Sequence, residues 1–115
     1  MDIVALQKQL AEFSRAREWD RFHSPKNLAM ALAAEAGELL ELFQWLSESE
    51  SANLDAPRKT AVADEVADIL IYLARLADRL DIDLDTAVVR KMQINAEKYP
   101  VALARGNATK YNGRD

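Results

Sequence analysis

The sequence predicts an all-α protein, built as a bundle of four to five helices. Apolar residues recur every three or four positions along most of the chain, which is the spacing of one face of a helix. No stretch alternates polar and apolar residues with the period of two that is typical of a strand. A chain of 115 residues favours one domain, and a domain of this size leaves much apolar surface exposed unless it self-associates. We therefore expect a helical homo-oligomer.

The first predicted helix covers roughly residues 2–18. Its apolar positions are Val4, Leu6, Leu10 and Phe13. The segment EWDRFHSP (residues 18–25) then interrupts the pattern. Ser24 and Pro25 are a favourable N-cap and first-turn pair, so they predict the start of a second helix, which runs on to Leu46.

The polar segment SESESANLDAP (residues 47–57) predicts a linker without periodicity. Asp55 and Pro57 begin a third helix, which is apolar on nearly every side as far as Leu80. A helix of this kind is typical of one that is buried within an oligomer. A turn at DIDLD (residues 81–85) precedes a fourth helix, which ends before Pro100. We therefore divide the chain into a helical domain at residues 1–99 and a basic tail at residues 100–115.

The composition excludes several classes of site. Cysteine is absent, which rules out disulfides, zinc–thiolate sites and thiol chemistry. A single histidine, His23, disfavours a histidine-rich metal site or a Ser-His-Asp triad. No apolar run approaches the roughly 20 residues of a membrane span, and the first residues lack a signal-peptide pattern. We expect a cytoplasmic protein with no membrane partner.

The charge pattern separates the end of the chain from the rest. The net charge of −4 argues against binding to a nucleic-acid polymer. Residues 90–115, however, hold 6 Lys and Arg against 2 Asp and Glu. This basic end either helps to neutralise an anionic ligand that a metal holds, or docks on the acidic face of a neighbouring chain.

Two pairs of carboxylates lie within otherwise apolar helices. Glu35 and Glu38 are three residues apart, and Glu65 and Asp68 repeat this spacing on the third helix, so each pair shares one helix face. If these two helices pack antiparallel, the four side chains converge. Such a cluster requires cations, and hard oxygen ligands without His or Cys suit Mg²⁺, with Mn²⁺ as a substitute. The alternative interpretation is a pair of solvated helix faces.

Aromatic residues lie in phase with these carboxylates. Tyr72 follows Asp68 by four residues, and Trp45 follows Glu38 by seven. They are candidates to stack on a base or bracket a sugar, although core packing is the ordinary role of such residues in a bundle. Trp19 belongs with His23 to the irregular segment after the first helix, where a binding role is more common.

At these residues the sequence resembles the MazG-type nucleotide pyrophosphohydrolases. The signature is ExxE followed by ExxD on two helices, here Glu35-Ala-Gly-Glu38 and Glu65-Val-Ala-Asp68. The blocks FHSPKNLAMAL, GELLELFQW, DILIYLARLA and KMQINAEKYP are similar to the dCTP pyrophosphatase branch, and the resemblance covers roughly residues 10–111.

The resemblance implies hydrolysis of a nucleoside triphosphate, dCTP or a modified dCTP first of all, to the monophosphate and pyrophosphate. Four carboxylates would hold Mg²⁺ on the triphosphate: Glu35, Glu38, Glu65 and Asp68. The base pocket would be lined by Trp19, Asp20, Arg21, Phe22, His23 and Trp45, with Tyr72 near the sugar. Lys91 and Asn95 would reach the phosphates or sugar from the same or another subunit, and weaker candidates of this kind are Lys98, Tyr99 and Lys110. The family also implies a homotetramer, built as a dimer of dimers.

One position departs from the family pattern. Close relatives carry a histidine near the nucleotide where this chain has Leu10, so the base preference stays open. One alternative is a pyrophosphohydrolase acting on dUTP or on a broad set of damaged nucleotides. Another is a non-catalytic helical module that binds a nucleotide, a metal or a partner helix. A third, a purely structural bundle, requires the four carboxylates to be exposed.

Overall fold

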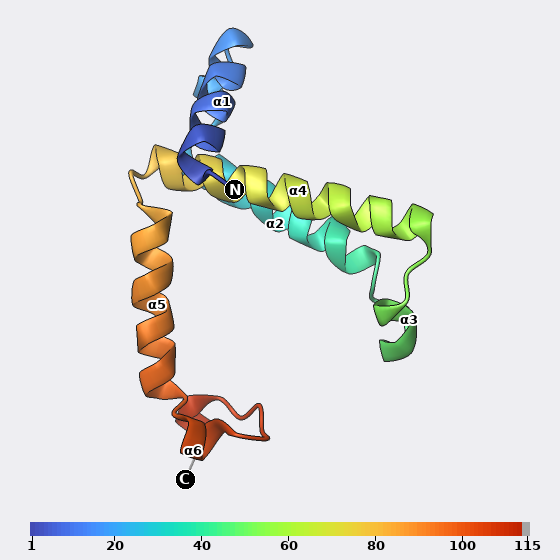
Figure 1. Cartoon of the computed structure of the whole chain (residues 1–115). Coiled ribbons are helices and arrows are strands. Elements are labelled where there is room, and N and C mark those ends of the chain that lie inside the picture. Colours follow the sequence, from blue (N-terminus) through green and yellow to red (C-terminus); the bar gives the residue numbers. More distant parts are fainter. Residues whose placement is uncertain (114–115) are drawn as a thin grey trace. The chain divides into compact units, whose positions relative to one another are not determined.

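The computed structural model describes residues 1–113 (Figure 1). Every regular element in this range is helical, which confirms the predicted all-α class. The elements are α1 (Ile3–Ala16), η1 (Asp20–Phe22), α2 (Pro25–Glu41), α3 (Glu48–Ala52), α4 (Ala56–Arg79), α5 (Leu84–Lys98), α6 (Val101–Ala104) and η2 (Tyr111–Gly113). The four predicted helices correspond to α1, α2, α4 and α5, and α3 and α6 are short additions. Within residues 1–113, no helix is both long and apolar enough to cross a membrane.

The chain forms two compact units, one from Met1 to Asp81 and a second that begins at Ile82. In the first unit, α2 and α4 lie side by side and run in opposite directions, joined through α3 (Figure 1). α1 also packs on α4. The buried apolar residues of this unit are Leu28, Ala74 and Ala77. The core therefore lies where the first half of α2 meets the second half of α4.

Local capping explains where α2 and α4 begin. The Ser24 hydroxyl accepts a hydrogen bond from the Asn27 backbone N–H at 3.1 Å, and Pro25 occupies the first turn of α2. Asp55 caps α4 in the same way, through the Arg58 N–H at 2.9 Å. Both starts were predicted from the sequence, because a cap depends only on residues three apart.

The predicted extent of the second helix was wrong at its end. α2 stops at Glu41, because the next backbone N–H groups bond to carbonyls three residues back, such as Phe43 N–H to Leu40 O at 3.0 Å. The predicted linker also contains a helix, α3. Ser47 and Glu50 form a reciprocal capping box, in which the hydroxyl accepts from one N–H and the carboxylate from the other.

α1 ends two residues earlier than predicted, at Ala16, in a Schellman-type turn. The Trp19 N–H donates to the Ser14 carbonyl at 2.9 Å, and the Glu18 N–H donates to the Arg15 carbonyl at 3.1 Å. Glu18 adopts the left-handed conformation that closes this turn, with φ of 57°. The turn directs the chain out of the helix and into the segment Trp19–His23.

The second unit contains α5, α6 and η2. The predicted basic tail contains a short helix, because α6 begins directly after Pro100, which has no N–H to donate and precedes the helix as its cap. Tyr111 folds back on the end of α5: its N–H donates to the Tyr99 hydroxyl at 3.4 Å, and Lys98 lies over its ring. The predicted tail extends to residues 114 and 115, which lie outside the described residues.

Candidate active site

Three of the four predicted carboxylates converge between α2 and α4. One oxygen each from Glu35, Glu38 and Glu65 lies within 4.8 Å of the others. Glu35 and Glu65 are half-buried, whereas Glu38 is exposed at the edge of the cluster. Helical spacing brings the first two together, and the packing of α4 against α2 adds the third.

Asp68 lies outside this close group, but its charge acts on the group. It follows Glu65 by three residues on α4 and is half-buried. A proton shared with Glu65 is the first cause that raises the pKa of Glu35, followed by burial and by the charges of Glu65 and Asp68. The pKa of Glu38 is likewise raised, first by a hydrogen bond with Glu35 and then by the negative charge of Glu35. The cluster therefore favours the binding of a proton or a cation.

Two carboxylate oxygens in the cluster are buried without a partner. They are Oε2 of Glu35 and Oε2 of Glu65, one from each helix. A buried polar atom without a hydrogen bond costs free energy, so such atoms are rare unless a ligand or ion completes them. The donor set consists of hard oxygens on two helices, which is the ligand set that Mg²⁺ and Mn²⁺ prefer. These residues therefore fit a divalent cation.

The two predicted aromatic neighbours lie in different surroundings. Tyr72 is half-buried on α4, one turn beyond Asp68, as predicted. Trp45 was predicted to lie two turns beyond Glu38 on the same helix. It instead follows the end of α2 in a turn, with 86% of its surface exposed. Its position is therefore set by the turn and not by helical spacing.

The irregular segment Trp19–His23 is held by a residue that the sequence analysis missed. Arg75, on α4, is only 5% exposed, and its Nη2 lies 2.8 Å from Oδ1 of Asp20. Its Nε donates to Nδ1 of His23 at 3.4 Å. The buried Ser14 hydroxyl contacts the same imidazole nitrogen at 3.2 Å. An arginine inside the apolar stretch of α4 was the available signal.

Three other residues of this segment present their side chains to solvent. Trp19 is 43% exposed and packs edge to face on Phe13, with ring centroids 5.7 Å apart. Phe22 is 55% exposed, with the Arg21 guanidinium over its ring at 4.7 Å. Exposed rings on an anchored segment are suited to stack on a flat ligand.

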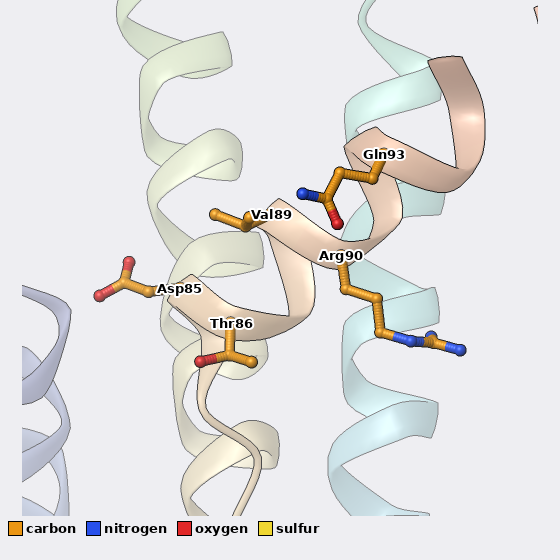
Figure 2. Close-up of a pocket in the computed structure, with 5 residues that line it drawn as sticks. All are labelled: Asp85, Thr86, Val89, Arg90 and Gln93. Carbon is orange, nitrogen blue, oxygen red and sulfur yellow. The ribbon is translucent and has the colours of Figure 1, made fainter. Parts of the chain in front are cut away.

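The remaining predicted residues belong to the second unit. Lys91 and Asn95 are exposed on α5, and Lys98 and Tyr99 lie at its end. A hollow of about 360 Å³ lies on the same helix, and Figure 2 shows the side chains that line it. Its lining residues are Asp85, Thr86, Val89, Arg90 and Gln93. The hollow includes neither Lys91 nor Asn95, so it provides no support for their predicted roles.

The sequence model of the MazG-like family matches residues 30–113, which include both carboxylate pairs. The chain belongs to the MazG-like family. It is 50% identical over 103 residues to dCTP pyrophosphatase 1 of Mus musculus and 48% identical to that of Homo sapiens. Each alignment covers 88% of this chain and 61% of the relative, so the chain spans less than two thirds of these curated proteins.

A solved structure is also similar to this MazG-like chain. It is a pyrophosphatase from Archaeoglobus fulgidus, 45% identical, with a TM-score of 0.79. The match covers 84% of this chain and 90% of that one. The resemblance inferred from the carboxylate motif is therefore confirmed at the level of the family and its helical fold.

Proposed function

We propose that this protein is a Mg²⁺-dependent nucleoside triphosphate pyrophosphohydrolase, with dCTP or a modified dCTP as its preferred substrate. The observation that carries the proposal is the cluster of Glu35, Glu38 and Glu65 with its two unpartnered oxygens. Relatives named dCTP pyrophosphatase 1, at 48–50% identity, support the choice of nucleotide.

The cation would be held by Glu35, Glu38 and Glu65, with Asp68 as the fourth ligand or as a neighbour that adds negative charge. When bound, Mg²⁺ neutralises charge that develops on phosphate oxygens and lowers the pKa of a water molecule. Mn²⁺ has similar ligand preferences and is expected to substitute.

Glu38 is our candidate for the general base. It is the exposed member of the cluster, so a water molecule can reach its carboxylate. The Glu38 carboxylate would accept a proton from water as the water oxygen bonds to the α-phosphorus. The bond from that phosphorus to the bridging oxygen breaks, so the products are the nucleoside monophosphate and pyrophosphate.

We propose that aromatic residues recognise the nucleoside. Trp19, Phe22 and Trp45 expose their rings, and Tyr72 lies one turn beyond Asp68 on α4. We also propose that Lys91 and Asn95 contact the phosphates or the sugar, from the same or another subunit. Because this chain has Leu10 where the family resemblance implies a histidine, a substrate such as dUTP or a broader set is the second candidate.

Exposed apolar residues on the first unit support self-association, which we propose to be a homotetramer in the cytoplasm. Large apolar side chains on α2 and α4 are well exposed, among them Met30 (61%), Leu40 (59%) and Val66 (50%). Covering them stabilises an oligomer at about 25 cal/mol per Å² of apolar area. Light scattering after size exclusion should give four times 12.9 kDa, and a monomer would contradict this proposal.

A nucleotide panel tests the proposed activity. Pyrophosphate release is measured from the eight common nucleoside triphosphates and 5-methyl-dCTP, with Mg²⁺ and with a chelator. We expect Mg²⁺-dependent release with dCTP or 5-methyl-dCTP ahead. Equal rates for all bases would support the proposed pyrophosphohydrolase activity and contradict the preference for cytosine. Nucleotide binding without release would favour the non-catalytic binding module.

A further inference from the structure

Arg75 is a charged residue in the core of the first unit, and most of its polar contacts are with one segment of the chain, Trp19–His23. With 5% exposure it is nearly as buried as Ala74 and Ala77, which are 0% and 4% exposed. A buried charge requires partners, and its guanidinium has them in Asp20 at 2.8 Å and Asp78 at 3.6 Å. Its Nε also donates to the His23 imidazole. Two of these three partners belong to Trp19–His23.

Helical register places Arg75 on the same face of α4 as the carboxylates. Asp68, Tyr72, Arg75 and Arg79 follow one another at intervals of four, three and four residues, which is one stripe of a helix. Seven residues of α-helix span about 10 Å, so Arg75 lies at a fixed distance along the axis from Asp68. α4 is therefore a rigid element that joins the carboxylates to the anchor of Trp19–His23.

The anchored segment has little structure of its own. It contains one 3₁₀ turn, Asp20–Phe22, and a turn of this length is weak in isolation. Arg79 adds a third bond from α4, since its Nε donates to the His23 carbonyl at 3.1 Å. Without these bonds, the segment would keep its contacts with α1 and α2, such as the Trp19 ring on Phe13 and the Asn27 side chain on the Phe22 carbonyl, but would no longer be fixed to α4.

We propose that Arg75 is a positioning residue of the nucleotide pocket. It fixes Trp19–His23 to the helix that carries Glu65 and Asp68, and thereby places the aromatic rings against the nucleoside. This inference rests on the proposed function, because it assigns the role of the segment in that reaction. Arg75 touches no substrate in this assignment and acts through Asp20 and His23.

The anchor also defines the state of His23. An arginine can only donate, so Nδ1 of His23 accepts from Arg75 and the imidazole proton resides on Nε2. The Ser14 hydroxyl lies 3.2 Å from the same nitrogen. The ring faces Arg75 and Arg79 of α4, Asp20 of η1 and Ser14 of α1. Burial and the charges of Arg75 and Arg79 lower the pKa of His23, and Asp20 opposes them. Protonation of Nδ1 removes the acceptor, so the anchor weakens at acid pH.

The test compares Arg75→Gln and Arg75→Lys with Arg58→Gln, an exposed arginine on the same helix. We expect Arg75→Gln to raise KM for the preferred nucleotide at least about tenfold with kcat changed less than threefold, because misplaced binding groups weaken substrate binding. Arg75→Lys keeps the charge but lacks the planar fork, so it is expected to show the same increase. Arg58→Gln should retain the wild-type constants.

His23 supplies a readout independent of turnover, because it is the only histidine in the chain. Imidazole ¹⁵N shifts should show the Nε2–H form in the wild type, with a pKa below 6.5 that rises in Arg75→Gln. If the wild type is active and a folded Arg75→Gln has the wild-type KM, this inference is overturned and the proposed function stands. The wild-type KM in Arg75→Lys would overturn it in the same way. If Arg75→Gln does not fold, Arg75→Lys decides. A wild type without turnover overturns the proposed function and this inference together.

Discussion

Glu35→Gln is expected to lower pyrophosphate release roughly a hundred- to thousandfold while making the metal-free protein more stable. The loss follows because Gln cannot supply the charged oxygen that the cation and the reacting phosphate require. The gain follows because the substitution removes a negative charge from a cluster in which three carboxylates lie within 4.8 Å. A single side chain would thus change activity and stability in opposite directions, as expected of a ligand and not of a structural residue.

The stability gain should depend on pH with a defined sign. The pKa of Glu35 is raised above its ordinary value of 4.5, so the metal-free folded state binds the proton more tightly than the unfolded chain. Its favourable contribution is complete below pH 4.5 and is lost as the pH rises through the raised pKa. Glu35→Gln does not titrate there, so its advantage in Tm over the wild type should grow from about pH 4.5 towards neutrality.

Glu12→Gln is the matched control for this experiment, since it removes an exposed glutamate of α1. It should change neither turnover nor the pH dependence of Tm. Thermal unfolding in chelator, measured from pH 4 to pH 8, gives the stability of all three proteins. A Glu35→Gln protein that is active, or less stable than the wild type at every pH, would contradict the assignment.

Leu28→Ala is expected to destabilise the protein by about 3 kcal/mol, the usual cost of a cavity left by a buried leucine. Leu28 is 1% exposed and is the largest fully buried side chain of the described residues. Small domains have total stabilities of about 5–15 kcal/mol, so the variant should unfold at a much lower urea concentration. The core around it is small, which leaves few other contacts to compensate.

Leu28→Met provides the comparison, because it conserves volume and should cost less than about 1.5 kcal/mol. Urea unfolding monitored by circular dichroism measures both variants. An alanine variant as stable as the methionine variant would mean that this contact contributes little, and that stability comes mainly from contacts between subunits.

The fold could be predicted from the sequence wherever the determinants are local. The starts of α2 and α4 follow from Ser24 and Asp55, each of which caps a helix through a residue three positions on. The end of α2 could not be predicted by periodicity, because Leu42 and Leu46 continue the apolar pattern after the backbone has left the helix. The Ser47–Glu50 capping box was readable, but the polar composition of its segment favoured a loop.

The carboxylate cluster of the candidate site was predictable from the sequence, and the contacts that support the neighbouring segment were not. Glu35, Glu38 and Glu65 follow from spacing on two antiparallel helices, and the structure brings them together. Asp68 lies outside the closest group, since its place depends on how α4 is rotated against α2. The role of Arg75 required knowledge of which segment packs on α4 more than fifty residues away in sequence. The roles predicted for Lys91 and Asn95 stay predictions.

The most direct test of the central claim measures Mn²⁺ binding to the wild type and to Glu65→Gln by electron paramagnetic resonance. Mg²⁺ serves as the competitor. If the carboxylates between α2 and α4 form the cation site, the wild type binds Mn²⁺, Mg²⁺ displaces it, and Glu65→Gln loses most of the affinity. Equal Mn²⁺ binding by both proteins, or none by a folded wild type with nucleotide present, would contradict the account.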